Sequence, residues 1–315
     1  MKNGDVMKLS FAPLEGITGY IYRNTHAEFF GSCDDYYTPF ISPSDNSKIG
    51  RKGFRDMIPE NNTVIKPKVQ VLTNNSVSFL KFTEKLKEYG YDEVNINLGC
   101  PSPTVVNKKR GSGLLREREL LENFLDEIFD KCDIKISIKT RIGFSCADEF
   151  ESLIDLYNKY PIELLTVHPR SRADFYKGDV NLEAFSLAYN RSKNPLCFNG
   201  NVFTKQDYDK IAAMFPNIDS IMLGRGAVSN PALFREIRGG EKVTTEKLLE
   251  FSELLKERYT AILSTDKFTM HKLKEIWLLM MWNFPKEEKI YKIVRRTESL
   301  SELMRAIHSL PALEI

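Results

Sequence analysis

One of the five cysteines has neighbours that suit an acid rather than a packing residue. Cys100 lies in the segment Asn97-Leu98-Gly99-Cys100-Pro101, between a glycine and a proline and just after a polar stretch. An unperturbed thiol has a pKa of about 8.5, so it is mostly protonated at neutral pH and can donate a proton. No adjacent residue type marks it as an activated thiolate nucleophile. We therefore predict that Cys100 is a general acid.

Two amides precede this cysteine on one face of an expected strand. In Val94-Asn95-Ile96-Asn97-Leu98 the side chains of Asn95 and Asn97 share a face, because side chains alternate along a strand. Amides inside a strand are costly unless they bind something. This pattern indicates a binding surface next to Cys100.

A lysine closes the following strand in the same way. Lys139 and Arg141 share a face with Ser137, opposite a row of isoleucines. If Lys139 points inward, it needs an anionic or electron-rich partner. The alternative is that Lys139 extends from the strand end into water. Considered by itself, the residue favours this alternative, because lysine is rarely buried unless it is paired.

Glycine-rich turns follow the last two expected strands. They are Asn199-Gly200-Asn201 and Gly224-Arg225-Gly226-Ala227. Glycines let backbone N–H groups approach a phosphate closely, and Arg225 can add a charged fork. Ordinary turn glycines are the alternative, but two such turns in these positions favour a phosphate site.

One of the four histidines also falls at a strand end. His168 is followed by Pro169-Arg170-Ser171-Arg172, which indicates a ligand contact, whereas His26, His271 and His308 lie in helical or surface patterns. Neither HExxH nor a cluster of histidine and cysteine occurs, so we expect no metal site.

These residues lie at the ends of separate strands, so they can act together only in a fold that brings the strand ends to one place. Eight short apolar runs alternate with helical patterns over the first 240 residues, which predicts an α/β fold, a (β/α)8 TIM barrel with its chemistry at the carboxyl ends of the strands. A doubly wound sheet is the rival, but a GxGxxG fingerprint is absent. The predicted strands are 8–12, 35–38, 68–72, 93–98, 134–139, 163–168, 196–199 and 220–224.

The strand signals stop at Gly239-Gly240. Helical patterns follow at 246–263, 271–282, 286–296 and 301–309, so we predict a catalytic domain at 1–240 and a small helical domain at 241–315. The second domain carries 13 basic and 12 acidic residues, yet Lys289, Lys292 and Arg296 share one helical face. This face is either an RNA contact or simply solvated. Lys108-Lys109-Arg110, after Cys100, is a second basic cluster.

Composition sets broad limits on the function. The chain has 315 residues, of which 42% are hydrophobic and 28% charged, with a net charge of +2. This composition suits a globular protein, and the small net charge gives no strong positive potential over the whole molecule that would attract nucleic acid. A local basic face can still bind nucleic acid. No apolar run approaches the roughly 20 residues of a membrane span, and a signal-peptide core is absent. With scattered cysteines, these features predict a soluble, cytoplasmic protein without disulfides or membrane contact.

In their order and spacing, the motifs resemble those of the dihydrouridine synthases, flavin-dependent enzymes that reduce uridine in tRNA. The resemblance covers essentially the whole chain. It is carried by Ala12-Pro13-Leu14-Glu15-Gly16-Ile17-Thr18, Gln70-Val71-Leu72, Asn95-Ile96-Asn97-Leu98-Gly99-Cys100-Pro101-Ser102, Lys139-Thr140-Arg141-Ile142-Gly143, Thr166-Val167-His168-Pro169-Arg170-Ser171, Asn199-Gly200-Asn201 and Gly224-Arg225-Gly226-Ala227.

The resemblance implies a role for each matching residue. Cys100 corresponds to the cysteine that donates a proton to uracil C5 while reduced FMN delivers hydride to C6, and Asn97 to the asparagine that holds the uracil. Arg141 and Tyr176 correspond to contacts with the extruded base. The flavin would be lined by Pro13, Leu14, Glu15, Gln70, Lys139 and His168, and its phosphate by Asn199, Gly200, Asn201, Gly224 and Arg225.

The leading hypothesis is therefore an FMN-dependent tRNA-dihydrouridine synthase that uses NADPH or NADH as reductant. We expect a monomer that binds tRNA through its helical domain and extrudes the target nucleotide into the barrel. A second hypothesis is an FMN barrel that acts on a free small molecule such as a pyrimidine. A third is an RNA-binding barrel with a vestigial pocket.

Overall fold

The computed structural model describes residues 7–43 and 54–315, and within them a ring of eight parallel strands surrounds a filled interior. The strand order is β2-β1-β8-β7-β6-β5-β4-β3. Parallel bridges between Tyr37 and Lys68 and between Ile41 and Val71 join the chain after β2 to the chain around β3, which closes the barrel. The strands are β1 (Lys8–Phe11), β2 (Asp35–Tyr36), β3 (Val69–Val71), β4 (Glu93–Leu98), β5 (Lys135–Gly143), β6 (Leu165–Ser171), β7 (Leu196–Asn199) and β8 (Ser220–Leu223).

The predicted TIM barrel is confirmed, and each predicted strand is present. Two strands are longer than expected: β5 and β6 run on beyond Lys139 and His168 to Gly143 and Ser171. The two extensions pair with each other across a register shift between Arg141 and Gly143. Pairing between neighbours, rather than intrinsic propensity, therefore stabilises the added residues, and it holds their side chains at the mouth of the barrel.

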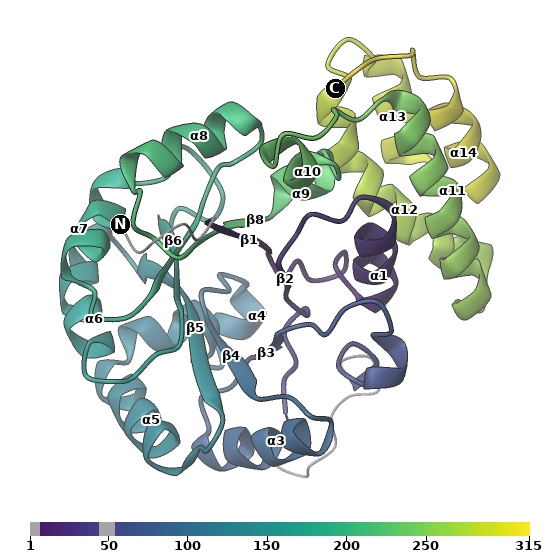
Figure 1. Cartoon of the computed structure of the whole chain (residues 1–315). Helices are drawn as coiled ribbons and strands as arrows, with labels where there is room; N and C mark the ends of the chain where they lie inside the picture. The colour runs from purple at the N-terminus through teal and green to yellow at the C-terminus, as the bar shows by residue number, and fades with distance from the viewer. Residues whose placement is uncertain (1–6, 44–53) are drawn as a thin grey trace.

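Helices cover the outside of the barrel (Figure 1). Asn75 caps one of them by accepting a hydrogen bond from the Ser78 N–H at 2.7 Å, and Thr204 and Asp207 form a capping box on another. Caps of this kind fix where the chain turns from a strand end into a helix. The main helices of this layer are α1 (Tyr20–Phe29), α3 (Ser76–Glu88), α5 (Arg118–Lys131), α6 (Phe150–Tyr157), α7 (Leu182–Arg191) and α8 (Lys205–Met214).

After β8 the described chain is helical. Two short helices, α9 (Arg225–Ser229) and α10 (Leu233–Ile237), lead into α11 (Thr245–Ile262), α12 (Asp266–Met280), α13 (Glu288–Arg296) and α14 (Leu300–His308). Trp277 is fully buried among them and donates its indole N–H to Ser252 at 3.0 Å. We call residues 241–315 the helical region; the boundary at Gly240 itself stays a prediction.

The helical region packs against one side of the barrel, next to α1 (Figure 1). Helix α11 contacts α1, and α12 contacts α9, which begins directly after β8. Phe251 of α11 packs against Tyr22, Phe29 and Phe30 of the barrel side with ring centroids 5.0 to 5.8 Å apart. This contact places the helical region beside the carboxyl ends of β1 and β8, at the rim where the predicted site lies. Within the described segments, no helix is both long and apolar enough to cross a membrane.

Candidate active site

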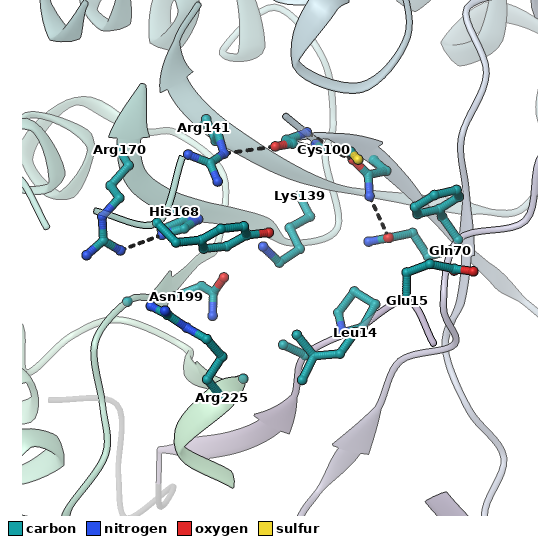
Figure 2. A pocket seen from close by; sticks show the side chains of 18 of the residues that line it. Leu14, Glu15, Gln70, Cys100, Lys139, Arg141, His168, Arg170, Asn199 and Arg225 are labelled. Atoms are coloured by element: carbon teal, nitrogen blue, oxygen red, sulfur yellow. Dashed lines mark hydrogen bonds between the residues drawn. The ribbon is translucent and has the colours of Figure 1, made fainter. Parts of the chain in front are cut away.

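A pocket opens at the carboxyl ends of the strands, and every residue predicted for the site lines it (Figure 2). It encloses about 930 Å³ of space, part of it open to solvent, which suits a cofactor-sized ligand. The prediction that these scattered segments converge is therefore confirmed, while the role of each residue stays a prediction. The predicted residues on its wall are Pro13, Leu14, Glu15, Gln70, Asn97, Cys100, Lys139, Arg141, His168, Tyr176, Asn199, Gly200, Asn201, Gly224 and Arg225.

Three amides form a chain of hydrogen bonds across β3 and β4. The Gln70 side chain donates to Asn95 Oδ1 at 2.7 Å and accepts from Asn97 Nδ2 at 2.8 Å. Asn95 in turn donates to Ser137 at 2.9 Å. The two strand amides thus satisfy each other through Gln70, which accounts for their burial without a ligand.

Asn97 also holds the chain around Cys100. Its Oδ1 accepts hydrogen bonds from the backbone N–H groups of Gly99 at 3.0 Å and Cys100 at 2.9 Å. The Cys100 carbonyl accepts from Ser112 through both its N–H at 3.1 Å and its hydroxyl at 2.8 Å. The cysteine is therefore fixed at its backbone on both sides, and Ser112 explains why the loop that follows Cys100 folds back onto it.

The thiol of Cys100 remains an acid in this setting. Burial raises its pKa above the ordinary value, although the Ser102 backbone and the Arg141 charge oppose that shift. Because the first cause outweighs the others, the thiol is protonated at neutral pH. This agrees with a proton donor and disfavours a thiolate nucleophile.

Lys139 lies half-buried on the pocket wall. Burial, together with the positive charge of Arg141, lowers its pKa to about 8. Among the described residues none forms a salt bridge with it, so the pocket offers a lysine that lacks a counter-charge. Of the two alternatives for Lys139, the inward position is the one found (Figure 2).

His168 is neutral and fixed by its neighbour on β6. Its Nε2 lies 3.0 Å from Arg170 Nη1, and since a guanidinium only donates, Nε2 accepts and Nδ1 carries the proton. Burial, then the charges of Lys139 and Arg141, hold the histidine pKa well below its usual value. The imidazole therefore presents an N–H to its surroundings from Nδ1.

Tyr176 sits between two arginines over the pocket. Its ring centroid lies 5.1 Å from the guanidinium of Arg141 and 5.2 Å from that of Arg225. The tyrosine is 51% exposed, while Arg141 is buried and donates to the Gly99 and Ser171 carbonyls at 2.9 and 2.7 Å. The two cations hold the half-exposed Tyr176 ring at the mouth of the pocket.

The two glycine turns lie against each other behind Arg225. A Cβ on Gly226 would come within 2.0 Å of the Val202 carbonyl oxygen, and one on Gly200 within 2.5 Å of the Phe198 ring. Only glycine permits this approach. Arg225 and Arg170 both reach Asn201 Oδ1, at 3.5 and 3.2 Å, so two cations converge at the same turn.

Six residues of the pocket were not among the predicted site residues: Ala12, Gly99 and Gly226, which lie within the quoted motifs, and Arg170, Phe40 and Phe203. Arg170 follows His168 by two positions and so shares its face, a signal that becomes clear only once β6 is known to continue. Phe40 and Phe203 lie in loops, where a single aromatic residue carries no pattern that would place it at a site. In the part of the chain that is described, no group of histidine, cysteine and carboxylate side chains is arranged to hold a metal ion.

Comparison with known proteins identifies the family. The family model described as dihydrouridine synthase matches residues 10–309 of the chain. The chain belongs to the dihydrouridine synthase family. Among curated relatives, tRNA-dihydrouridine(16) synthase of Neisseria meningitidis is 26% identical, with 96% of this chain and 94% of that protein aligned.

Two further matches place the chain more broadly. The tRNA-dihydrouridine synthase B of Pseudomonas aeruginosa is 29% identical, over 60% of this chain and 58% of that protein's length. Among solved structures, morphinone reductase matches with a TM-score of 0.51 and 11% identity, covering 74% of this chain and 86% of that one. At 11% identity the match to morphinone reductase supports the barrel fold alone. The family assignment rests on the match to the dihydrouridine synthase family model.

Proposed function

We propose that this dihydrouridine synthase family member reduces uridine in tRNA to 5,6-dihydrouridine with a bound flavin, FMN, as the redox group. The observation that carries the proposal is the pocket, where a protonated, backbone-anchored Cys100 and a lysine without a counter-charge face one cavity at the mouth of the barrel. Both groups suit a reduction in which hydride and proton come from different donors.

The pocket residues fit an FMN. Asn199, Gly200, Asn201, Gly224 and Arg225 would hold the phosphate, because the glycine turns leave room for close approach and the arginine supplies charge. Pro13, Leu14, Glu15, Gln70, Lys139 and His168 would line the ring system. An electron-rich ring edge would give Lys139 the partner that the described residues do not. When bound and reduced, the flavin supplies the hydride.

The chain itself would supply the proton and the orientation. Cys100 would donate its Sγ proton to uracil C5, while the hydride arrives at C6. Asn97 sets the position of Cys100 through its two backbone hydrogen bonds, and it stands where it can also hold the uracil. Arg141 and Tyr176, stacked at 5.1 Å, form the surface against which the extruded base would rest.

The helical region would hold the RNA. A uridine stacked in a folded RNA cannot reach a barrel mouth, so the nucleotide has to leave its stack. Exposed basic residues on and before α13, together with Lys108 and Lys109 after Cys100, suit contacts with the phosphates of a bound RNA. The residues proposed on and before α13 are Lys286, Lys289, Lys292, Arg295 and Arg296.

The remaining assignments complete the proposal. NADPH or NADH reduces the flavin, the protein acts as a monomer, and its place of action is the cytoplasm, where tRNA is modified. The alternative, a flavin barrel for a free pyrimidine, would use the same pocket but leaves the helical region and its basic face without a purpose.

Mapping of dihydrouridine in RNA from cells with and without the gene tests this function. We expect one or a few tRNA positions to lose dihydrouridine in the deletion strain and to regain it when the gene is restored, but not when Cys100→Ala is supplied. An unchanged dihydrouridine map, together with turnover of free pyrimidines by the purified protein, would favour the alternative.

A further inference from the structure

A second cleft lies where the barrel meets the helical region, beside the catalytic pocket. It encloses about 800 Å³, part of it open to solvent. Glu15 and Phe40 belong to the walls of both cavities, so the two are neighbours with a common partition. The other walls come from α1 and the turn before it, from the chain around Arg55, and from α11 and α12.

The partition is the turn that follows β1, and the helical region holds it in place. Within the turn, Thr18 Oγ1 accepts from the Leu14 N–H at 2.8 Å. Lys272 of α12 donates to the Gly16 carbonyl and lies 3.8 Å from Glu275. Gly16 has a φ of +86°, and a Cβ there would lie 3.2 Å from Glu275, so the turn fits closely against α12. The position of the partition thus depends on the docked helical region.

The lining of this cleft suits a nucleotide. Tyr20 and Phe40 provide aromatic rings, and Ile262, which is 52% exposed, adds an apolar side chain. Lys272 and Arg55 bring two positive charges to the same cleft, which a phosphodiester can contact. Of the two carboxylates in the lining, Glu15 and Asp56, the second is already paired with Arg23 at 3.4 Å. Aromatic side chains bind unpaired bases by stacking and tolerate any base, because every base has a π-face.

We propose that this cleft binds the nucleobase next to the uridine that is reduced, so that the enzyme takes up two consecutive nucleotides. The proposal rests on the proposed function. When one nucleotide leaves a stack, the next nucleotide in the RNA chain loses its stacking partner. A stacking site on the other side of the shared wall would replace that contact. One phosphodiester links the two nucleotides, which agrees with two cavities that share Glu15 and Phe40.

The same geometry disfavours the reductant as occupant. In NADPH the nicotinamide and the adenine are separated by two riboses and a pyrophosphate, a longer connection than a shared wall calls for. The cleft also includes residues of α11 and α12, and a barrel that only exchanged electrons with a free dinucleotide would not need these helices to build it.

The test combines a protein change with an RNA change. The protein variants are Tyr20→Ala, Tyr20→Phe and Ile262→Ala, with Phe268→Ala as a control, since Phe268 is similarly exposed at 54% but does not line the cleft. The RNA substrates are an unmodified tRNA and two versions with an abasic site on either side of the target uridine. Flavin content, NADPH oxidation without RNA, and KM and kcat for each RNA are measured.

We expect Tyr20→Ala to raise KM for intact tRNA by about tenfold, the size of one base stack, with little change in kcat. Tyr20→Phe should restore the wild-type KM, and Ile262→Ala should show a smaller rise. One abasic site should raise KM for the wild type by a similar factor and add nothing to Tyr20→Ala.

Several outcomes would overturn the subsite. The first is a rise in KM from Tyr20→Ala that adds to the rise from each of the two abasic sites. The second is a Tyr20→Ala variant that loses only NADPH oxidation. The third is a rise in KM from Phe268→Ala as large as that from Tyr20→Ala. A wild-type protein that reduces no tRNA at all would contradict the proposed function instead, so the two failures are distinguishable.

Discussion

At the scale of single residues, the proposed proton donor Cys100 has an anchored backbone and a thiol that stays protonated. Asn97 and Ser112 fix its N–H and carbonyl, and burial raises its pKa. We predict that Cys100→Ala retains the flavin but lowers the rate of uridine reduction by about 100- to 10,000-fold, the usual effect of losing a general acid. Single-turnover reoxidation of the reduced flavin by tRNA measures this loss.

A matched variant separates the acid from a general effect of removing a thiol. Cys146→Ala, at an exposed cysteine outside the pocket, should leave the same rate unchanged. Normal turnover by Cys100→Ala would show that the proton comes from another group.

We predict that Lys139 makes flavin affinity depend on pH. Burial lowers its pKa to about 8, so the lysine is a cation at pH 7 and is largely neutral at pH 9. We expect the dissociation constant of FMN from the apoprotein to rise by up to about tenfold per pH unit above 8, because an electron-rich ring loses its positive partner. Lys139→Met should bind FMN more weakly at pH 7 and show no such rise; titrations of flavin fluorescence at both pH values report it. An identical pH dependence in wild type and variant would contradict the role.

Residue types predicted the site well where chemistry limits the choice. Lys139, His168 and Cys100 stand out in the sequence because apolar strands seldom end in such groups. The contacts between them could not be predicted. That Gln70 satisfies both strand asparagines, and that Arg170 fixes the tautomer of His168, follows from distances between strands that no single segment encodes.

At the scale of elements, the glycine turns after β7 and β8 should tolerate no side chain. In Gly226→Ala the added Cβ would lie 2.0 Å from the Val202 carbonyl oxygen, so the backbone of one turn has to move. We predict a loss of about 1 to 3 kcal/mol in the free energy of unfolding, and FMN binding weakened by more than tenfold.

Gly90→Ala is the control for this prediction. Nothing lies within 4 Å of its Cβ position, but its φ is +78°, so it should cost about 1 kcal/mol through backbone strain alone. It should leave FMN binding unchanged. Chemical denaturation and flavin titration of both variants measure these effects; equal flavin affinities for Gly226→Ala and wild type would show that the turns do not hold the phosphate.

Element positions were predictable because strands and helices differ in period and in their boundary residues. The eight strands and the capping box of α8 follow from such local signals. The extensions of β5 and β6 do not, since they depend on each strand pairing with the other across a register shift. That extension places Arg141 and Arg170 inside the mouth.

At the scale of the whole molecule, a buried histidine ties the barrel to the chain that leads to the helical region. His26 Nε2 donates to the Pro231 carbonyl at 2.8 Å, which leaves Nδ1 to accept from the Tyr36 hydroxyl, also at 2.8 Å. Burial lowers the histidine pKa from 6.5 to about 4. Between pH 4 and 6.5 the His26 imidazole binds a proton in the unfolded chain but not in the folded protein, so stability falls as the pH drops below about 6.5.

We predict that His26 contributes about 1 kcal/mol per pH unit to this fall between pH 6 and 4.5. Denaturant unfolding across that range should give a shallower pH dependence for His26→Gln than for wild type, while His271→Gln, at an exposed position, should follow the wild type. Equal slopes for His26→Gln and wild type would show that His26 is protonated in the folded protein.

The helical region should make RNA affinity sensitive to salt. Lys289 and Lys292 are exposed on α13, so replacing both with glutamate should weaken tRNA binding and reduce the salt dependence of the binding constant by about one charge per lysine. Lys131→Glu, exposed at the end of α5, is the control. Binding measured at several salt concentrations tests this; unchanged slopes would move the RNA contact elsewhere.

The most direct test of the central claim is one turnover under anaerobic conditions. The purified protein, its flavin reduced, is mixed with an unmodified tRNA that contains the target uridine or with the same tRNA carrying cytidine at that position. We predict that the flavin absorption returns only with the uridine-containing tRNA and that one dihydrouridine forms per flavin reoxidised. Reoxidation by both RNAs alike, or by neither while free uracil is reduced, would contradict the claim.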